Sequence, residues 1–435
     1  MTLKPALFDQ VDPGEVAGAV PLIQPWRVVP LDPDYSGAWV IAGDVNGDGQ
    51  VEIVSARNVN VGDIHYTSAV VAQDLDGRVL WRWGDPRIGR RGLHHDVACQ
   101  IHDWDNDGHA EVILCTAGFL VEIEGATGAE RRRLPLPPDA TDCLVFADLA
   151  GRGWASDVLV KTRYSQIWAL DHSGRLLWTV QKPGGFPTAH QPMPVDLDGD
   201  GRDEILAGYA MLNPDGQVRW ALPGDWRFTG SGHLDCGRVL RRGSTPAECQ
   251  LVVTCCAHHR LVAMDGTGRV CWEVTGHHFE SIDIGRISPE RPGLQMLVDL
   301  VPPADGHRNY PLWVVNEDGE LLGQLLVDYG RFHTLADWNG DGLDELVVPH
   351  TRGLFDCRGE RIATFAMPPQ ADVFGGQPRE QGEIGHIVLR GDMSGGGGPD
   401  LLLTGPDAVY VFRNEKRRPE LPASALGTGT NFTLY

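Results

Sequence analysis

The sequence predicts an eight-bladed β-propeller, an all-β fold in which four-stranded antiparallel sheets repeat around a central channel. Two recurring motifs predict it, together with the lack of a helical period anywhere between them. The first motif is an acidic loop followed by an apolar run, as in DLDGDGRDEIL from Asp196. The second is a glycine turn between two short apolar runs. Units of four strands at intervals of about 50 residues are typical of propellers. Seven blades remain the alternative.

The acidic loop marks the turn between the first two strands of each unit. Complete copies begin at Asp44, Asp103, Asp196 and Asp337. Degenerate copies begin at Asp148 and Asp392, and the apolar frame alone recurs from Gly237 and Gly285. These eight copies set the expected number of blades.

The glycine turn marks the outer hairpin of each unit. It reads DLDGRVLW, DHSGRLLW, NPDGQVRW and DGTGRVCW, and a tryptophan follows each glycine by four residues: Trp81, Trp178, Trp220 and Trp272. Glycine-centred turns between apolar runs predict hairpins. The tryptophans are expected to be packing anchors.

The repeats predict that residues 1–435 form one propeller domain. It would have an N-terminal extension over about 1–30, blades over about 31–415 and a closing tail over 416–435. Residues 23–31 (IQPWRVVPL) and the final NFTLY are expected to supply strands that close the ring.

The composition restricts the partners. A formal charge of −22 excludes nucleic acid and anionic membranes as favoured partners. Nine irregularly spaced cysteines without a CxxC pair suggest reduced thiols and a reducing compartment. The N-terminal residues lack the pattern of a signal peptide, and no apolar stretch approaches a membrane span. We therefore expect a cytoplasmic protein.

The complete acidic loops carry oxygen ligands at positions 1, 3, 5 and 9. The sets are Asp44, Asn46, Asp48 and Glu52; Asp103, Asp105, Asp107 and Glu111; Asp196, Asp198, Asp200 and Glu204; and Asp337, Asn339, Asp341 and Glu345. Alternate oxygen ligands with glycines that let the chain curl suit Ca²⁺. The prediction is a structural role, in which calcium or plain hydrogen bonds hold the turn, in preference to calcium sensing.

Polar side chains recur at the other end of the predicted channel-lining strands. Residues about six positions before the acidic turn lie about 20 Å from it, at about 3.3 Å per residue. Such residues are His95, Asp96, Asp142, His190, His333 and His386, and His233, Asp235, His277 and His278 begin the two degenerate units. Ends of second strands add Lys161, Arg163, Tyr164, Tyr209 and His258, among others. We expect these groups to meet at one funnel, opposite the acidic loops.

Elimination next to a carboxylate fits these residue types best. Abstracting the proton α to a uronate carboxylate needs a base and a group that neutralises the carboxylate. Histidine and tyrosine can act as base, and arginine, histidine or a metal can neutralise. A glycoside hydrolase using Asp96 with Asp142 or Asp235 is one alternative. A non-catalytic carbohydrate-binding or scaffold propeller, with its polar groups spread around the rim, is the other.

The acidic repeats, GHLDCGRV and HHFESIDIGRISPERPGLQ together resemble the rhamnogalacturonan lyases of polysaccharide lyase family 11. More loosely, the chain resembles the propeller lyases that release L-rhamnose from glucuronic acid. The resemblance implies an eight-bladed propeller with calcium loops and a calcium ion in the cleft. His190, His233 and Asp235 match three of its ligands. The fourth, a glutamate, falls near Cys255 or Cys256, and neither is a good calcium ligand. A softer ion, or histidines acting without a metal, remain the alternatives.

The resulting hypothesis is a lyase that cleaves a rhamnose–uronate bond by β-elimination, exo-acting on imported acidic oligosaccharides. His95 or Tyr164 would be base or acid, and Arg163 with Lys161 would bind the carboxylate. The remaining expected cleft residues are His278, Arg331 and His333.

Overall fold

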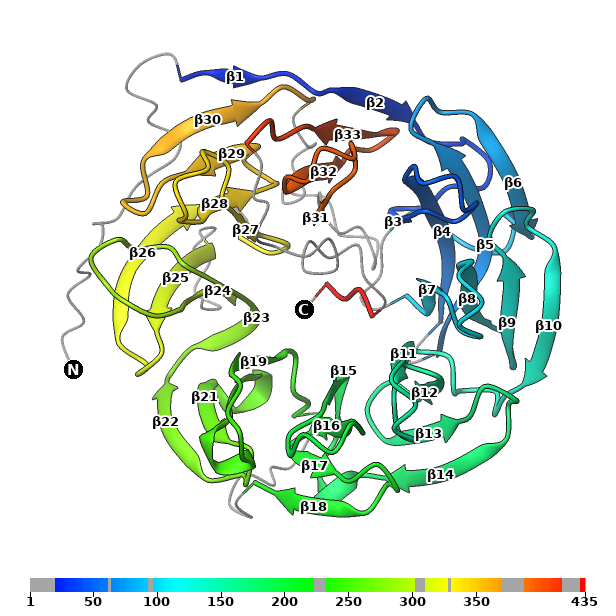
Figure 1. Cartoon of the computed structure of the whole chain (residues 1–435), viewed down its shortest axis with the longest axis horizontal. Helices are drawn as coiled ribbons and strands as arrows, with labels where there is room; N and C mark the ends of the chain where they lie inside the picture. Colours follow the sequence, from blue (N-terminus) through cyan, green and yellow to red (C-terminus); the bar gives the residue numbers. More distant parts are fainter. Residues whose placement is uncertain are drawn as a thin grey trace.

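The computed structural model describes residues 20–61, 64–92, 97–222, 232–301, 310–327, 330–368, 387–416 and 431–434. Eight β-sheets stand around a central axis, and the predicted eight-bladed propeller is confirmed (Figure 1). Blade 1 comprises β3 (Trp39–Gly43), β4 (Glu52–Val61), β5 (Ile64–Asp74) and β6 (Val79–Gly84), and blade 2 comprises β7 (Cys99–His102), β8 (Glu111–Thr116), β9 (Phe119–Glu124) and β10 (Glu130–Pro135). Blade 3 comprises β11 (Cys143–Ala147), β12 (Asp157–Lys161), β13 (Gln166–Leu170) and β14 (Leu176–Gln181), and blade 4 comprises β15 (Thr188–Val195), β16 (Glu204–Gly208), β17 (Ala210–Leu212) and β18 (Val218–Ala221).

The other four blades have the same order of strands. Blade 5 comprises β19 (Gly237–Arg241), β20 (Gln250–Cys255), β21 (Arg260–Asp265) and β22 (Val270–Thr275), and blade 6 comprises β23 (His278–Gly285), β24 (Gln295–Val301), β25 (Tyr310–Asn316) and β26 (Leu321–Val327). Blade 7 comprises β27 (Thr334–Ala336), β28 (Glu345–Val348), β29 (Gly353–Phe355) and β30 (Arg361–Phe365), and blade 8 comprises β31 (Val388–Gly391), β32 (Asp400–Thr404) and β33 (Ala408–Phe412) with β2 (Arg27–Pro30). Successive strands within a blade pair antiparallel.

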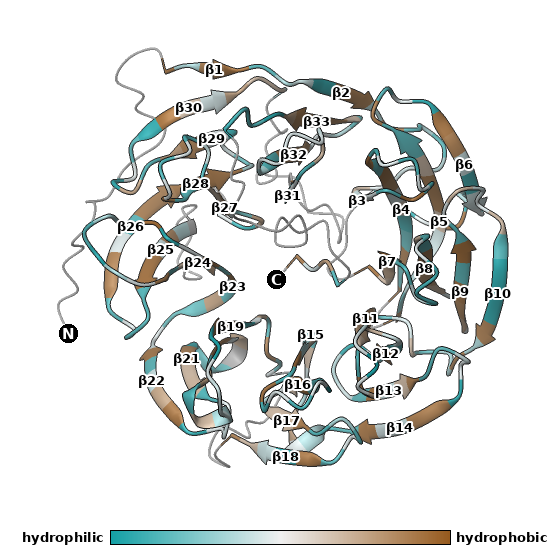
Figure 2. Ribbon diagram, viewed as in Figure 1, coloured by the Kyte–Doolittle hydropathy of each residue, from teal (hydrophilic) through white to brown (hydrophobic). Residues whose placement is uncertain are grey.

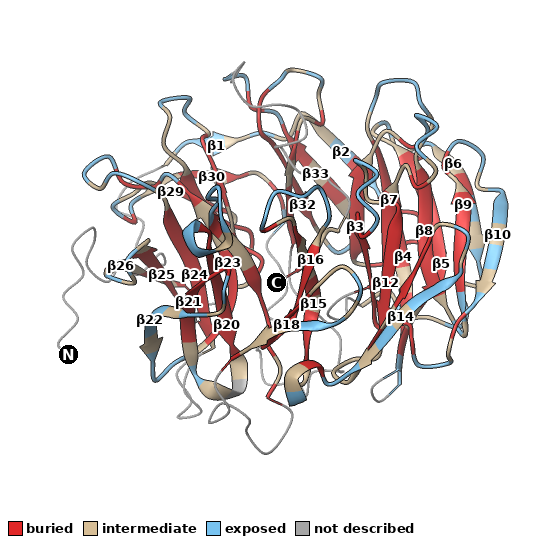
Figure 3. Ribbon diagram, turned by 60° about the horizontal axis from the view of Figure 1, so that its bottom comes forward, coloured by how far each residue is buried: buried red, intermediate tan, exposed pale blue. Residues whose placement is uncertain are grey.

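Burial follows the position of a strand within its blade. Every residue of β12 is buried, whereas the outermost β14 alternates between exposed and partly buried residues. An inner strand has a neighbouring blade on each face, so both faces lose contact with water. Figure 3 shows buried residues on the inner strands and exposed ones on β10 and β14. Figure 2 shows apolar residues concentrated on the strands, with hydrophilic residues in many connecting loops.

The acidic loops occupy the predicted turn between the first and second strands. In blade 4, the carboxylate of Asp196 accepts the amide protons of Gly199 and Gly201 at 2.8 and 3.1 Å. Glu204 Oε2 accepts the amide of Leu197 at 3.0 Å. The acidic side chains therefore fold the loop around its own backbone amides.

The tryptophans after the glycine turns join each blade to the next. Trp220 Nε1 in blade 4 donates a 2.9 Å hydrogen bond to the carbonyl of Gly266 in blade 5. Gly268 in that turn has φ +85°, and a Cβ there would lie 2.6 Å from the Trp220 ring. Glycine is therefore required by both conformation and space. Trp81, Trp178 and Trp272 bond in the same way to Gly125, Pro214 and Glu317.

The N-terminal segment closes the ring, as we predicted from the sequence of residues 23–31. β2 pairs antiparallel with β33 and completes blade 8, and β1 (Leu22–Ile23) adds a parallel fifth strand to β30 in blade 7. Val29 of β2 is fully buried. The first and last parts of the chain thus share one sheet, which holds the two ends of the ring together.

The C-terminal residues 431–434 differ from the expected closing strand. They form no strand and lie in the central channel (Figure 1). Asn431 both donates to and accepts from the backbone of Phe146 in blade 3, at 2.8 and 2.6 Å. The backbone of Phe432 makes a matching pair with the side chain of Gln100 in blade 2. Side-chain amides of the tail (Asn431) and of β7 (Gln100) thus pair with backbone groups across the channel, in place of a further strand.

All nine cysteines lie in described residues and are free thiols, as the sequence predicted. In the described part of the chain, we find no helix with the length and apolar character needed to cross a membrane.

Candidate functional site

The strands place a group of polar side chains at the end of the channel away from the acidic loops. His190 lies near the start of β15, and the loop at residues 196–203 follows the end of that strand. The His190 amide donates to the carbonyl of Leu234 at 3.0 Å, and the Asp235 amide donates to Thr254 at 3.1 Å. The first of these backbone bonds joins blade 4 to the segment that leads into blade 5, and the second fixes that segment within blade 5.

Asp235 is the centre of what we call the Asp235 cluster, formed with His190, His233, Cys256 and His278. Asp235 Oδ1 lies 3.0 Å from His233 Nε2 and 3.5 Å from His190 Nε2. Ligand atoms of these three residues all lie within 4.8 Å of one another. The structure thus brings together the three residues that the family resemblance assigned to the cleft metal.

The other side of the cluster comes from blades 5 and 6. Cys256 opens a short 3-10 helix (Cys256–His258) after β20, and its Sγ lies 3.0 Å from His278 Nε2. The same nitrogen lies 4.0 Å from Asp235 Oδ2 and 3.3 Å from Glu280 Oε1. Arg331 Nη2 donates to Glu280 Oε2 at 2.7 Å. His278 therefore faces the cluster, and Arg331 is paired with a carboxylate.

Tyr164 connects the cluster to a second group, which we call the Arg163 group (His65, Asp142, Lys161 and Arg163). The ring of Tyr164 stacks on His233 at 4.2 Å and 14°. Its hydroxyl lies 3.4 Å from His190 Nε2. The Arg163 guanidinium lies 5.0 Å over the Tyr164 ring and donates to His65 Nε2 at 2.7 Å. A cation, a phenol and an imidazole thus lie in contact.

Lys161 has a different place from the one expected. Its side chain is 1% exposed, and its ammonium donates to Asp142 Oδ2 at 2.9 Å and to the carbonyl of Arg163 at 2.5 Å. The buried ammonium neutralises Asp142 and fixes the turn that carries Arg163. Direct contact with a substrate carboxylate, as the sequence suggested for Lys161, does not fit this burial.

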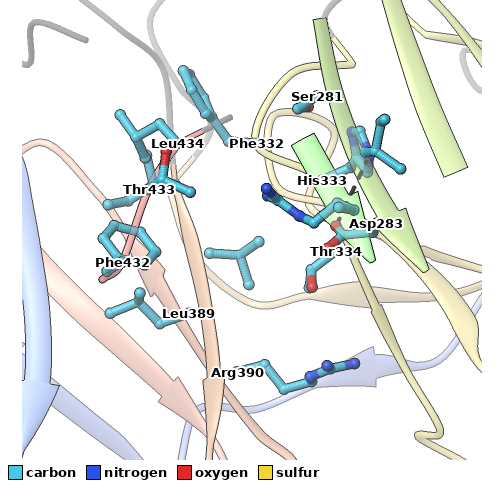
Figure 4. A pocket seen from close by; sticks show the side chains of 14 residues that line it. Ser281, Asp283, Phe332, His333, Thr334, Leu389, Arg390, Phe432, Thr433 and Leu434 are labelled. Atoms are coloured by element: carbon cyan, nitrogen blue, oxygen red, sulfur yellow. Dashed lines mark ion pairs between the residues drawn. The ribbon is translucent and has the colours of Figure 1, made fainter. Parts of the chain in front are cut away.

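His333 also departs from its expected place in the cleft. Its two ring nitrogens lie 3.0 and 3.1 Å from the carbonyls of Gly330 and Leu297, so it braces the backbone. Figure 4 shows His333 on the wall of an axial pocket beside Asp283, with Phe432 and Leu434 of the tail across from them. His333 therefore faces the channel and its tail.

Burial sets the protonation of the site residues. It lowers the pKa of His190 well below its ordinary value, and the nearby charges of His233 and Arg163 lower it further. Burial also raises the pKa of the Tyr164 phenol. At neutral pH, His190 is thus a neutral imidazole able to accept a proton, next to a phenol that carries one. The pKa of Glu280 is also raised by burial, although Arg331 opposes the shift.

The cleft residues do not fit calcium. Ca²⁺ takes six to eight oxygen ligands. The Asp235 cluster offers imidazole nitrogens from His190, His233 and His278, a thiol from Cys256 and one central carboxylate, with the Glu280 carboxylate beside His278. Nitrogen and sulfur donors favour borderline or soft ions. We therefore assign no chemistry to a cleft calcium.

The blade loops have oxygen donors that do fit calcium, with a feature that the sequence did not predict. Ligand atoms of Asp103, Asp105 and Glu111 gather within 4.8 Å, as do those of Asp196, Asp198 and Glu204. Each of these two loops is entered by an arginine from the outermost strand of its own blade. Arg131 lies 3.5 Å from Asp105, and Arg219 lies 2.9 Å from Asp198. In the loops at Asp44 and Asp337, the amide groups of Asn46 and Asn339 donate to the loop glutamates at 3.0 and 2.6 Å.

His95 and Asp96 lie outside the described residues, so the prediction of His95 as catalytic stays a prediction. Sequence reasoning missed His65 and Glu280. His65 reaches Arg163 from the long β4–β5 hairpin of blade 1, whose strands of 10 and 11 residues exceed most others. The extra length of this hairpin was the feature that could have pointed to His65 as a site residue. Glu280 follows His278 by two residues on β23, on the same side of the strand.

Fold and site together define an eight-bladed propeller with a cluster of histidine, arginine and tyrosine at one end of its channel. A family model for "Rhamnogalacturonan lyase family 11, C-terminal domain" matches residues 20–131. The rhamnogalacturonan endolyase YesW and exolyase YesX of Bacillus subtilis strain 168 are each 26% identical to the chain. The alignments cover 70% and 75% of this chain. The chain spans 61% and 63% of the lengths of those two relatives.

Solved structures show the same fold. The crystal structure of YesW superposes with a TM-score of 0.65 at 20% identity, over 94% of this chain and 82% of that one. The Bacillus licheniformis rhamnogalacturonan lyase superposes at 0.64 and 20% identity, with the same coverage. The chain thus resembles the rhamnogalacturonan lyases of family 11 in sequence and in fold.

Proposed function

We propose that this chain is a polysaccharide lyase that cleaves a rhamnose–uronic acid bond by β-elimination. The similarity to rhamnogalacturonan lyases supports the substrate class. One geometric observation carries the chemistry: the Arg163 guanidinium, the Tyr164 phenol and the neutral His190 imidazole form a contiguous set. Elimination next to a carboxylate needs a cation at the carboxylate and a proton acceptor at the α-carbon.

Each step can be assigned to residues of the chain. Arg163 binds the uronate carboxylate and stabilises the charge that develops when the C5 proton leaves. His190 accepts that proton through the Tyr164 hydroxyl, which lies 3.4 Å from His190 Nε2. The electrons of the C5–H bond form a double bond between C4 and C5, and the bond from C4 to the glycosidic oxygen breaks. A proton returns to that oxygen, so the reaction consumes no water.

Hydrolysis has less support. A glycoside hydrolase needs one carboxyl group that donates a proton and a second that attacks or activates water. Asp142 is buried and bound to the Lys161 ammonium at 2.9 Å, so it is held in an internal ion pair away from solvent. Asp235 is 2% exposed, and its Oδ1 faces the imidazoles of His190 and His233.

The finer parts of the proposal concern the substrate's size and charge. Arg163 suits an acidic oligosaccharide, and the net charge of −22 disfavours nucleic acid and anionic membranes. Exo action on imported oligosaccharides remains a prediction, because the two curated relatives include one endolyase and one exolyase.

Product analysis tests the proposal. The full chain is incubated with rhamnogalacturonan oligosaccharides of defined length, and products are identified by mass spectrometry. We expect a fragment with an unsaturated uronate end, lighter by one water than the hydrolytic fragment. Release of only the terminal unit would establish exo action. Saturated fragments alone would overturn the lyase in favour of a hydrolase, and unchanged substrate would favour a binding propeller.

A further inference from the structure

We propose that Asp235, Cys256 and His278 bind a zinc-class divalent ion through one carboxylate oxygen, the thiolate sulfur and an imidazole nitrogen. The inference concerns metal binding and does not rest on the proposed lyase activity. It is separate from the His190–His233 side of the cluster, which shares only the carboxylate of Asp235.

Three segments of the chain bring the donors together. Asp235 precedes β19, Cys256 follows β20, and His278 begins β23. One ligand atom from each lies within 4.8 Å of the others. Cys256 Sγ and His278 Nε2 are 3.0 Å apart, and His278 Nε2 and Asp235 Oδ2 are 4.0 Å apart. An ion with bonds of about 2.0–2.3 Å fits between donors at such separations.

The carboxylate of Asp235 provides a second, independent observation. Asp235 is 2% exposed, and its Oδ2 is buried and has no hydrogen bond of ordinary geometry from the described residues. Burying a carboxylate oxygen without a partner is costly. An ion between Asp235 Oδ2, Cys256 Sγ and His278 Nε2 would give that oxygen a partner.

The donor chemistry selects the ion. Sulfur and imidazole ligands favour Zn²⁺ and similar d-block ions over Ca²⁺ and Mg²⁺, which prefer oxygen. Glu280 Oε1 lies 3.3 Å from the same His278 nitrogen and offers an oxygen to complete four-fold coordination. On binding, the Cys256 thiol releases its proton to solvent and its sulfur bonds the ion, so no oxidant or reductant is needed.

Metal content and cobalt spectroscopy test the proposal on the full chain. The protein is stripped with a chelator, dialysed against Zn²⁺, and its metal measured by elemental analysis. The same protein is then titrated with Co²⁺. We expect a retained zinc equivalent, and a thiolate-to-cobalt charge-transfer band in the near ultraviolet. Neither should be displaced by excess Ca²⁺.

Variants locate the ion. Cys256→Ala should abolish the cobalt–thiolate band and weaken Zn²⁺ binding by more than the 10–100-fold that loss of an outer partner typically costs. Cys271→Ala, at an exposed cysteine, is the matched control and should behave as wild type. His278→Gln should also lose the zinc equivalent, and its circular dichroism spectrum checks that it folds.

Two results would overturn the proposal. Folded Cys256→Ala that retains zinc as tightly as wild type would show that the thiol is not a ligand. Zinc that is lost with His190→Ala but kept with Cys256→Ala would place the ion on the other side of the cluster.

Discussion

The ring of Tyr164 lies nearly parallel to that of His233, at 4.2 Å and 14°, while its hydroxyl lies 3.4 Å from His190 Nε2. Stacking on His233 fixes the orientation of the Tyr164 ring and holds the Tyr164 hydroxyl next to the imidazole of His190. Tyr164→Phe should preserve the stack and remove only the hydroxyl. Because general acid–base groups contribute typically about 10²–10⁴-fold, kcat/KM on rhamnogalacturonan oligosaccharides should fall by that order.

The melting temperature of Tyr164→Phe should stay close to that of wild type. Tyr410→Phe on β33 in blade 8 is the matched control and should keep full activity. Wild-type kcat/KM in the Tyr164 variant would remove the hydroxyl from the mechanism.

Calcium should stabilise the blade loops. Ligand that binds only the folded state at 100 times its Kd adds about 2.7 kcal/mol per site to the free energy of unfolding. Calorimetry after chelation should therefore show a melting temperature that rises with Ca²⁺ and less with equal Mg²⁺. Asp341→Ala, which removes the position-5 ligand of the blade 7 loop, should reduce the rise. A melting temperature indifferent to Ca²⁺ would refute structural calcium.

Trp220 should stabilise the junction of blades 4 and 5. Trp220→Phe keeps an aromatic ring and loses the donor to the Gly266 carbonyl, which should cost about 1 kcal/mol of unfolding free energy. Trp220→Ala also loses the packing against Gly268 and should cost about 3–5 kcal/mol. Leu176→Ala, at a side chain on β14 that is 51% exposed, should change little. Urea denaturation measures all three, and equal stability of the two Trp220 variants would argue against blade-to-blade packing.

Asp32 should make ring closure sensitive to acid. Burial alone would raise its pKa. The hydrogen bonds from Arg82 and from the Tyr35 amide outweigh burial, and the net pKa is lowered. A lowered carboxyl pKa adds stability above the unfolded pKa of about 3.9, and the gain is lost as pH falls through the folded value.

Asp32→Asn should therefore cost about 1–2 kcal/mol at pH 7, by denaturant unfolding. Below the lowered pKa, the variant and wild type should converge. Asp76→Asn, at a side chain that is 82% exposed, is the control. A difference between Asp32→Asn and wild type that is independent of pH would show that the charge of Asp32 is not its cause.

The blades were predictable because each one carries its own local signals. The acidic loop at Asp196 fixes a turn through bonds within a few residues, and Trp220 with Gly268 follows a repeat that can be counted. The place of the tail was not predictable. Asn431 binds the backbone of Phe146, 285 residues away, through its side-chain amide, which belongs to no repeat.

The site was predictable only where it follows the repeat. His190 sits at a fixed distance before an acidic loop, and His233 and Asp235 follow from the resemblance. Lys161 was placed correctly on its strand, but its pairing with Asp142 depends on the packing of two neighbouring strands. Glu280 was missed because its role in the site depends on its hydrogen bond with Arg331, which lies 51 residues later in the chain.

The ultraviolet absorbance of an unsaturated uronate, followed during incubation with rhamnogalacturonan oligosaccharides, tests the central claim most directly. Wild-type protein should produce the absorbance steadily. Arg163→Ala should lower the rate by about 10²–10³-fold, as expected for loss of a group that stabilises developing negative charge. Arg175→Ala, at a side chain that is 72% exposed, should not change it. Oligosaccharide cleavage without new absorbance, or Arg163→Ala as active as wild type, would contradict elimination at this site.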